Sequence, residues 1–214
     1  MLELGLKTLL AYLGGSLLGS LILGSLRGVD IRAMGSGNAG ATNAMRTQGT
    51  MFGLLVFAVD FAKGALMIWW LPEAVLPGVG ADPDVSRQWL TLACGLAVIV
   101  GHVYPLWFGF RGGKGAATIA GVIAALDAHL LVPLAICWLA VVMLTGYVGL
   151  ATMLAGVGLS AAVLVLRPGN WPLLGFCAVL TGFMVFTHRS NIARMRAGKE
   201  NRVRRLWLFR PRAV

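Results

Sequence analysis

The chain has 214 residues, of which 58% are hydrophobic and only 12% are charged, and its mean hydropathy is +0.81. A soluble domain is typically about half apolar and about a quarter charged, so this composition excludes an ordinary soluble protein and indicates an integral membrane protein. The net charge of +10 indicates an anionic membrane surface rather than nucleic acid, because half of the basic residues lie between Arg189 and Arg212, after the last apolar run.

Seven apolar stretches are candidates for membrane helices, since a spanning helix needs about 20 mainly apolar residues. They cover residues 6–26, 51–71, 89–107, 115–127, 129–145, 147–166 and 171–187. The fourth and fifth are short and meet at Asp127 and His129, so half-depth helices or one bent crossing are alternatives there. We predict an all-α integral membrane protein with seven transmembrane helices, and five or six spans remain the alternative counts.

The loops predict how the chain is oriented. Basic residues gather in the 27–50 loop, in the 108–115 loop and in the C-terminal tail, whereas the loops 72–88 and 167–170 carry few. With seven spans, all three basic segments fall on one side, which the positive-inside rule assigns to the cytoplasm. The N-terminus is then outside, the C-terminus is cytoplasmic, and residues 1–214 form a single transmembrane domain. Because the start of the chain lacks a basic n-region, we interpret the first apolar run as a retained helix.

The first polar loop, residues 35–46, reads GSGNAGATNAMR. Glycine permits positive φ and close approach to a ligand, and small hydroxyl and amide side chains cap a following helix. Arg46 adds a planar fork of donors that suits phosphate. The alternative is a plain polar connection between two membrane helices. The candidate binding residues of this loop are Ser36, Gly37, Asn38, Thr42, Asn43 and Arg46.

The second polar loop, residues 101–115, reads GHVYPLWFGFRGGKG. It is not a Walker A sequence, since Phe108 and Gly115 stand where that pattern needs glycine and Ser or Thr. Gly112 and Gly113 nevertheless offer backbone N–H groups beside Lys114 at a predicted helix start, which favours anion binding. The alternative is that Arg111 and Lys114 only anchor the cytoplasmic side. His102 has a structural and a functional reading, and both stay open.

Two further pairs of polar residues lie three positions apart. His188 and Asn191 share a face if the last helix continues, and they would suit the orientation of a substrate hydroxyl. Asp60 and Lys63 lie inside the second span, where charges are costly and normally paired or directed into a polar cavity. Whether they form a self-neutralising pair or support chemistry stays open.

The cysteines give no sign of thiol chemistry or of a metal site. Cys94, Cys137 and Cys177 each lie inside an apolar run, away from any histidine, and we interpret them as buried filler. No metal ion and no organic cofactor is expected. Three polar segments on one membrane face, rich in Arg, Lys and glycine, indicate a site for one or more phosphates next to lipid.

The segments GSGNAGATNAMR, GHVYPLWFGFRGGKGAAT and THRSNIARMRAGKEN occur in this order. Together with the length and span pattern, they closely resemble the bacterial acylphosphate-dependent glycerol-3-phosphate acyltransferase family. The resemblance implies transfer of a fatty acyl group from acyl phosphate to the sn-1 hydroxyl of glycerol 3-phosphate, giving lysophosphatidate and phosphate for phospholipid biosynthesis. It also implies a multi-pass protein of the bacterial inner membrane with a cytoplasmic active site, and a separate transacylase that makes the acyl phosphate is a candidate partner.

The resemblance also implies roles for residues in the three motifs. We expect Arg46 and Lys114 to bind phosphate and stabilise charge, and His188 to act as a base or to orient the hydroxyl. The substrate's own phosphate is an alternative proton acceptor. The further expected binding residues are Ser36, Gly37, Asn38, Thr42, Asn43, Gly112, Gly113 and Asn191. The expected supporting residues are Asp60, Lys63, His102, Arg111 and Glu200.

The chain lacks the His-x4-Asp arrangement of other glycerophosphate acyltransferases, because Trp107, Leu134 and Ala193 follow the three histidines at that spacing. An acyl phosphate has a stable anionic leaving group, so no covalent acyl-enzyme is expected. One departure from the family concerns residues 146–152, where a polar stretch with serines is common. Thr152 is a substitute for one serine, Gly149 leaves another unreplaced, and a phosphate contact there is in doubt.

Two other classes of function compete with an acyltransferase. A transporter for an organic phosphate predicts polar residues along a path through the bilayer, for which the main candidates are Asp60, Lys63, Asp127 and His129. A phosphoalcohol transferase using a metal and a nucleotide-linked lipid predicts a carboxylate-rich cytoplasmic motif. Asp30 and Glu200 are too few for that motif, so the acyltransferase is the preferred function.

Overall fold

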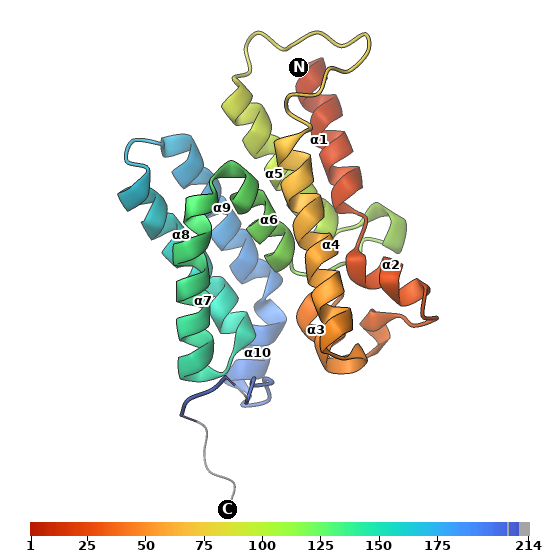
Figure 1. The fold of residues 1–214 in the computed structure, drawn as a ribbon, viewed down its shortest axis with the longest axis vertical. Helices are drawn as coiled ribbons and strands as arrows, with labels where there is room; N and C mark the ends of the chain where they lie inside the picture. Colours follow the sequence, from red (N-terminus) through yellow and green to blue (C-terminus); the bar gives the residue numbers. More distant parts are fainter. Residues whose placement is uncertain (205, 210–214) are drawn as a thin grey trace, which may run out of the picture. The chain divides into compact units, whose positions relative to one another are not determined.

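The computed structural model describes residues 1–204 and 206–209, and all regular structure in them is helical (Figure 1). The all-α prediction is therefore confirmed. The chain divides into two compact units, Met1–Asp127 and Ala128–Val214, and the prediction of one domain stays a prediction. Arg205, Arg210 and Arg212 of the predicted basic tail lie outside the described residues.

The first unit is a bundle of helices joined by the two glycine-rich loops. Its elements are α1 (Leu2–Gly15), α2 (Gly19–Ser25), η1 (Ile31–Ala33), α3 (Ala41–Gln48), α4 (Thr50–Trp69), α5 (Arg87–Val103), η2 (Leu106–Phe108) and α6 (Ala116–Leu126). Helix α4 packs along α6, α1 packs along α5, and α3 packs against α4. The first loop was predicted over residues 35–46, but only residues 35–40 precede α3, and residues 41–46 belong to that helix. The second, predicted over 101–115, begins in the last turn of α5 and ends directly before α6.

The second unit contains the third motif. Its elements are η3 (Ala128–Leu130), α7 (Leu131–Thr145), α8 (Val148–Leu166), α9 (Trp171–Thr187) and α10 (Arg189–Arg196). Helix α8 packs against both α7 and α9. The chain after α10 returns to the turn between α7 and α8, where the Arg202 guanidinium lies 4.4 Å from the ring centroid of Tyr147 and 4.1 Å from that of Trp207.

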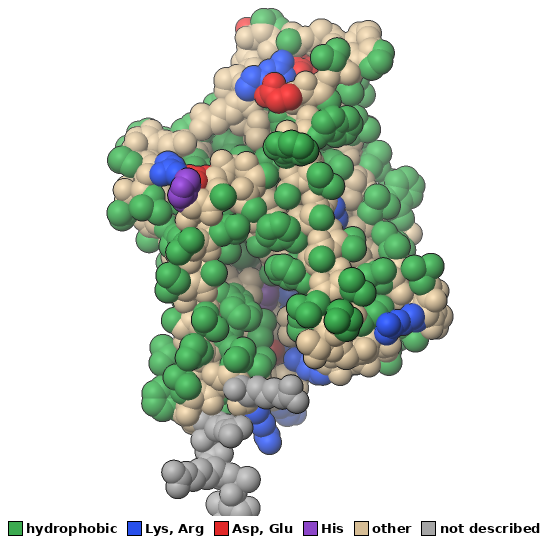
Figure 2. Space-filling view, viewed as in Figure 1, with side chains coloured by type: hydrophobic (Ala, Val, Ile, Leu, Met, Phe, Trp, Pro, Cys, Tyr) green, Lys and Arg blue, Asp and Glu red, His purple; other side chains and the backbone are tan. Residues whose placement is uncertain are grey.

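The helices fit a membrane protein, but the number of spans stays a prediction. Four helical stretches are long and apolar enough to cross a bilayer, and two bent pairs, α1 with α2 and α9 with α10, raise the number to six. Helix α6 has 11 residues, so at 1.5 Å per residue it is about half as long as a spanning helix. Many large hydrophobic side chains are exposed on the surface, as Figure 2 shows for one face. The predicted total of seven and the predicted orientation are not tested by these lengths.

Close contacts between backbones hold α1 against α5. A Cβ atom on Gly15 would lie 2.1 Å from the carbonyl oxygen of Val98, and one on Gly101 would lie 2.1 Å from that of Tyr12. Small residues of this kind allow membrane helices to approach closely.

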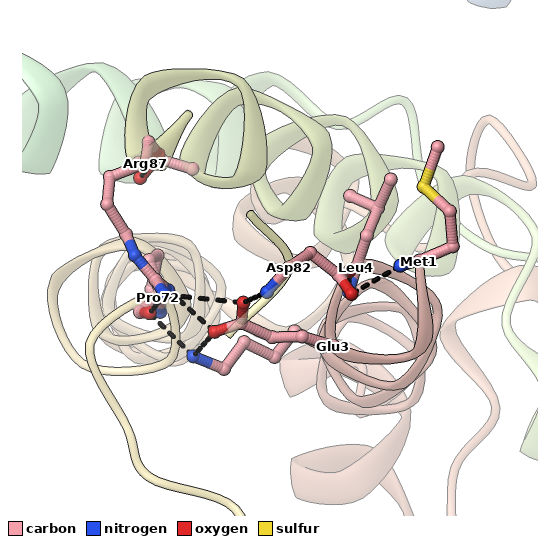
Figure 3. Close-up of polar contacts among 8 residues, drawn as sticks. Met1, Glu3, Leu4, Pro72, Asp82 and Arg87 are labelled. Atoms are coloured by element: carbon pink, nitrogen blue, oxygen red, sulfur yellow. Dashed lines mark hydrogen bonds and ion pairs between the residues drawn. The ribbon is translucent and has the colours of Figure 1, made fainter. Parts of the chain in front are cut away.

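A buried ion cluster joins the start of α1 to the start of α5 and to the loop between α4 and α5 (Figure 3). The Lys7 ammonium donates to the Glu3 carboxylate at 2.9 Å and to the carbonyl of Pro72 at 2.6 Å. Arg87 donates to the same carboxylate at 2.6 Å, and the backbone N–H of Asp82 donates to it at 2.9 Å. Lys7 is only 1% exposed, and its contacts with the Glu3 carboxylate and the Pro72 carbonyl compensate the cost of burying its charge.

The α1–α5 contact predicts that Gly15→Ala destabilises the protein, because a methyl group has no room against the Val98 carbonyl. Overpacking of this kind costs about 1–3 kcal/mol, which a thermal unfolding scan in detergent should show as a lower midpoint. Gly5→Ala in the same helix is the matched control, since a Cβ there meets nothing within 4 Å. Equal midpoints for the two variants would contradict the packing argument.

Candidate active site

The first glycine loop is held in shape by the side chain of Asn43. Its Oδ1 accepts the backbone N–H of Ser36 at 2.9 Å, and its Nδ2 donates to the carbonyls of Ile31 and Met34 at 3.1 and 2.9 Å. Gly35 has a φ of +55°, and a Cβ there would lie 2.4 Å from the Asn43 oxygen. The sequence predicted Asn43 as a ligand, and the structure uses both ends of its amide to fix the loop.

The other predicted residues of this loop surround that fixed turn. Ser36 and Asn38 are partly buried, and Thr42 and Arg46 are exposed on α3. Gly37 has a φ of +73°, a conformation that favours glycine. The polar side chains with access to solvent are therefore Ser36, Asn38, Thr42 and Arg46.

Arg32 links the first loop to the second, and sequence reasoning did not single it out. Its Nη1 donates to the carbonyls of Phe108 and Arg111 at 2.9 and 3.1 Å, while its other guanidinium nitrogens hold the carboxylate of Asp30. The hydrogen bonds from Arg32 hold the pKa of the Asp30 carboxyl below its usual value, so the pair is charged at neutral pH. The sequence signal was the Asp30-x-Arg32 spacing, which positive-inside counting treated only as charge.

The second loop turns back along the last turn of α5. The N–H of Gly112 donates to the carbonyl of Val103, and that of Gly113 donates to the carbonyl of His102, both at 3.1 Å. The sequence predicted that these two N–H groups bind an anion. In the structure they instead donate to backbone carbonyls and close the loop. The reason is that Pro105 and η2 reverse the chain, which brings residues 112 and 113 against carbonyls that the end of α5 leaves unpaired.

The donors next to Lys114 come from the first turn of α6. Ala116 and Ala117 are the first residues of α6, so their backbone N–H groups have no acceptor within the helix. Gly115, with a φ of +86°, sets the direction in which this turn begins. Lys114 is half-buried beside these N–H groups, and Arg111 is exposed. A lysine and a helix N-terminus together are suited to a phosphate.

The two glycine loops meet at Gly113. A Cβ on Gly113 would lie 2.2 Å from His102 Nε2 and 3.1 Å from the carbonyl oxygen of Ala39 in the first loop. The same Ala39 carbonyl accepts a hydrogen bond from the hydroxyl of Ser20 at 2.8 Å. The structure thus brings the first and second motifs together, with Gly113 fitted between a histidine ring and a backbone oxygen.

Beneath the loops, Asp60, Lys63 and His102 form one buried cluster. The Lys63 ammonium lies 3.0 Å from Asp60 Oδ1 and 3.0 Å from His102 Nδ1. Exposure is 1% for Asp60, 8% for Lys63 and 2% for His102. The sequence predicted the i, i+3 ion pair on α4, and the structure adds the histidine of α5 to it.

In the second unit, His188 lies at the bend between α9 and α10, and it is 4% exposed. Its Nδ1 lies 2.8 Å from the carbonyl oxygen of Met184. Because a carbonyl can only accept, this nitrogen carries the proton, and in the neutral ring Nε2 is an acceptor. That tautomer is the one a proton-accepting histidine needs.

Asn191 is fixed from two sides within the same unit. Its Nδ2 donates to Glu200 Oε1 at 2.8 Å, and Arg194 Nε donates to Glu200 Oε2 at 2.6 Å. Gly149 on α8 leaves room for it, since a Cβ there would lie 2.8 Å from Asn191 Nδ2. Glu200 therefore supports Asn191, and Gly149 is a residue whose part in the third motif sequence reasoning missed.

Thr152, for which a phosphate contact was in doubt, and the cysteines lie within the packed helices. Thr152 is 6% exposed, and its hydroxyl donates to the Val148 carbonyl and accepts from Trp138 Nε1. Cys94 and Cys177 are fully buried, and Cys137 is half-buried. In residues 1–204 and 206–209, no group of three or more His, Cys, Asp or Glu side chains is arranged to hold a metal ion.

Comparison with known proteins gives one consistent family. The family model described as "Glycerol-3-phosphate acyltransferase" matches residues 6–198. The chain is 37% identical over 195 residues to the glycerol-3-phosphate acyltransferase of Aquifex aeolicus, covering 90% of this chain and 95% of that protein. It is 38% identical over 204 residues to that of Listeria welshimeri, covering 95% and 98%.

Solved structures agree with the sequence comparisons. The chain is similar to the crystal structure of PlsY (YgiH), an integral membrane glycerol 3-phosphate acyltransferase, in its glycerol 3-phosphate form. The TM-score is 0.80 at 32% identity, and the match covers 93% of this chain and 94% of that one. The lysphosphatidic acid form of that protein matches with a TM-score of 0.78.

The contacts of Arg32 predict that Arg32→Gln loosens the second loop, because the carbonyls of Phe108 and Arg111 lose their donor. Hydrogen exchange followed by mass spectrometry should show faster exchange over residues 105–113, by about tenfold or more if roughly 1.4 kcal/mol of local stability is lost. Arg196→Gln removes the same charge from an exposed side chain and is the control. Unchanged exchange in the Arg32 variant would show that the loop does not depend on this link.

Proposed function

The chain belongs to the glycerol-3-phosphate acyltransferase family, and on this basis we propose that it transfers a fatty acyl group from acyl phosphate to the sn-1 hydroxyl of glycerol 3-phosphate. The products are lysophosphatidate and inorganic phosphate. The observation that carries the proposal is the meeting of the two glycine loops at Gly113, directly beside Lys114 and the first turn of α6. This arrangement offers a phosphate both a cationic side chain and backbone N–H donors.

The proposed reaction needs charge stabilisation more than covalent machinery. Both substrates carry phosphate, so positively charged groups must offset repulsion between them and the charge that develops on the leaving phosphate. We assign this work to Lys114 and Arg46. Ser36, Asn38 and Thr42 are assigned to phosphate or hydroxyl oxygens, with Gly37 giving the backbone its turn.

The hydroxyl of glycerol 3-phosphate attacks the acyl carbonyl carbon, the carbon–oxygen bond to phosphate breaks, and phosphate departs with the bonding electrons. The hydroxyl proton goes to His188 Nε2 or to a phosphate oxygen of the substrate. Support for His188 is the hydrogen bond from its Nδ1 to Met184, which leaves Nε2 as the basic nitrogen. Asn191, supported by Glu200, is assigned to orienting the hydroxyl.

A direct transfer without an acyl-enzyme fits the positions of the thiols. Cys94 and Cys177 are fully buried within α5 and α9, and the half-buried Cys137 on α7 donates its thiol to the carbonyl of Leu154. An acyl phosphate already carries a good leaving group, so positioning and charge stabilisation account for the reaction. No metal ion or organic cofactor is assigned a role.

The proposed setting is the bacterial inner membrane, with seven spans, the N-terminus outside and the motif loops facing the cytoplasm. The basic loops on the proposed cytoplasmic side support this orientation. The proposal treats residues 1–214 as one acyltransferase domain. A transacylase that produces acyl phosphate is the proposed partner, and the product enters phospholipid biosynthesis.

The experiment that tests the proposal measures lysophosphatidate and phosphate made by purified protein from glycerol 3-phosphate. Parallel reactions contain acyl phosphate, acyl-CoA or acyl carrier protein as the donor. We expect product from acyl phosphate alone. Product from a thioester would overturn the proposed donor, and binding of glycerol 3-phosphate without product from any donor would favour a transporter.

The assignment of charge stabilisation predicts that Lys114→Ala and Arg46→Ala each lower kcat/KM by at least about 100-fold, the size of effect typical for loss of one stabilising donor. Both variants should retain the thermal unfolding midpoint of the parent protein. Arg196→Ala is the matched control for loss of one cytoplasmic-side charge. Near-normal turnover by either site variant would remove that residue from the phosphate site.

A further inference from the structure

The first membrane helix is broken, and the broken ends are held by the ion pair of α4. Helices α1 and α2 are bent by 47° at residues 16–18. The Lys63 ammonium donates to the carbonyls of Gly15 and Leu17 at 2.9 and 3.0 Å. Asp60 Oδ1 accepts the first N–H of α2, that of Gly19, at 3.1 Å. Each charge thus meets the helix end of opposite polarity.

If Asp60 and Lys63 served only to neutralise each other, they would not need hydrogen bonds to the backbone at the helix break. Backbone groups exposed by a helix break inside a membrane cost several kcal/mol each unless they find partners. Lys63 and Asp60 satisfy three such groups with one buried pair, so the break and the pair depend on each other. Replacing either charge leaves unpaired carbonyls or an unpaired N–H at the same place.

The Lys63 ammonium also contacts His102, whose imidazole ring lies against the second loop. Lys63 Nζ lies 3.0 Å from His102 Nδ1, on one edge of the imidazole ring. On the opposite edge, Nε2 lies 2.2 Å from where a Cβ of Gly113 would be. The ring is therefore wedged between the ammonium and the loop backbone, and its position determines how closely Gly113 approaches α5.

The broken helix contacts the first loop as well. Ser20, one residue after Gly19, donates its hydroxyl to the carbonyl of Ala39. This carbonyl is the one that faces Gly113 from the other side. Two routes thus run from the Asp60–Lys63 pair to the point where the loops meet, one through His102 and one through α2 and Ser20.

We propose that Asp60, Lys63 and His102 are positioning residues for the two glycine loops. The ion pair fixes the α1–α2 break and the imidazole ring, and the break and the ring together fix the positions of Gly113 and the adjacent Lys114. This proposal rests on the proposed function, in which Lys114 binds the phosphate of a substrate. A loop that is already fixed in its binding conformation lowers the entropic cost of substrate binding. The affinity for glycerol 3-phosphate therefore depends on the Asp60–Lys63 ion pair.

The first arm of the test compares two buried lysines of the same unit. Lys63→Met removes the ammonium and keeps the length of the side chain. Lys7→Met does the same in the Glu3–Arg87 cluster, whose described contacts do not include the loops. Both variants are expected to lower the unfolding midpoint. Only Lys63→Met should raise the KM for glycerol 3-phosphate, by about tenfold or more, measured at a temperature where both are folded.

The second arm uses the contact between His102 and Gly113. Gly113→Ala places a methyl group against the imidazole ring, and His102→Ala removes the ring. If the ring sets the loop, the two substitutions are coupled, and the double variant has a KM for glycerol 3-phosphate well below the product of the two single effects. This arm keeps the test valid even if Lys63→Met fails to fold.

The outcomes separate this proposal from the proposed function. A parent enzyme that makes product establishes the function whatever the variants do. Equal KM values in the Lys63 and Lys7 variants, or multiplicative effects of Gly113→Ala and His102→Ala, would overturn the positioning role alone. A parent enzyme inactive with every donor would instead overturn the proposed function, and binding of glycerol 3-phosphate by the same variants would then test the positioning role.

Discussion

The structure of the first unit depends on one constraint: a break in a membrane helix must find partners for its backbone groups within the protein. Here the partners are Asp60 and Lys63, two charges that lipid would otherwise exclude. The ion pair provides partners for the backbone groups at the helix break, and the same hydrogen bonds offset the cost of burying the two charges. The result is a buried charged cluster whose His102 ring contacts the second loop at Gly113.

Glycine has two separate uses in these loops. At positions 35 and 37 it allows positive φ, which a polar turn before α3 requires. At positions 112 and 113 it allows backbone to lie against His102, where a side chain would collide. The second use closes the loop directly before Lys114 and the first turn of α6. Under the proposed function, such a loop would have its phosphate donors in place before the substrate arrives, which favours positioning of the reacting groups.

The features that could be predicted from the sequence are those encoded by local residue patterns. Apolar runs indicated the helices, clusters of glycine with polar residues indicated the first two motif segments, and the His188–Asn191 spacing indicated the third. The family that these segments resemble is confirmed by the family model. The Gly14-Gly15-Ser16 signal for a helix break lay inside a run that was interpreted as one continuous helix. Sequence reasoning also missed features that depend on residues distant in the chain. Arg32 resembles any loop charge until its carbonyl partners, Phe108 and Arg111, are known. The cluster of Lys7 with Arg87 was missed for the same reason.

The most direct test of the account is equilibrium binding of glycerol 3-phosphate to the purified protein in the absence of any acyl donor. The account predicts saturable binding that inorganic phosphate displaces and glycerol does not, because the loops recognise the phosphate group. Saturable binding that glycerol displaces and phosphate leaves unchanged would contradict it. Absence of saturable binding would equally contradict the claim that the loops are set for phosphate before the donor arrives.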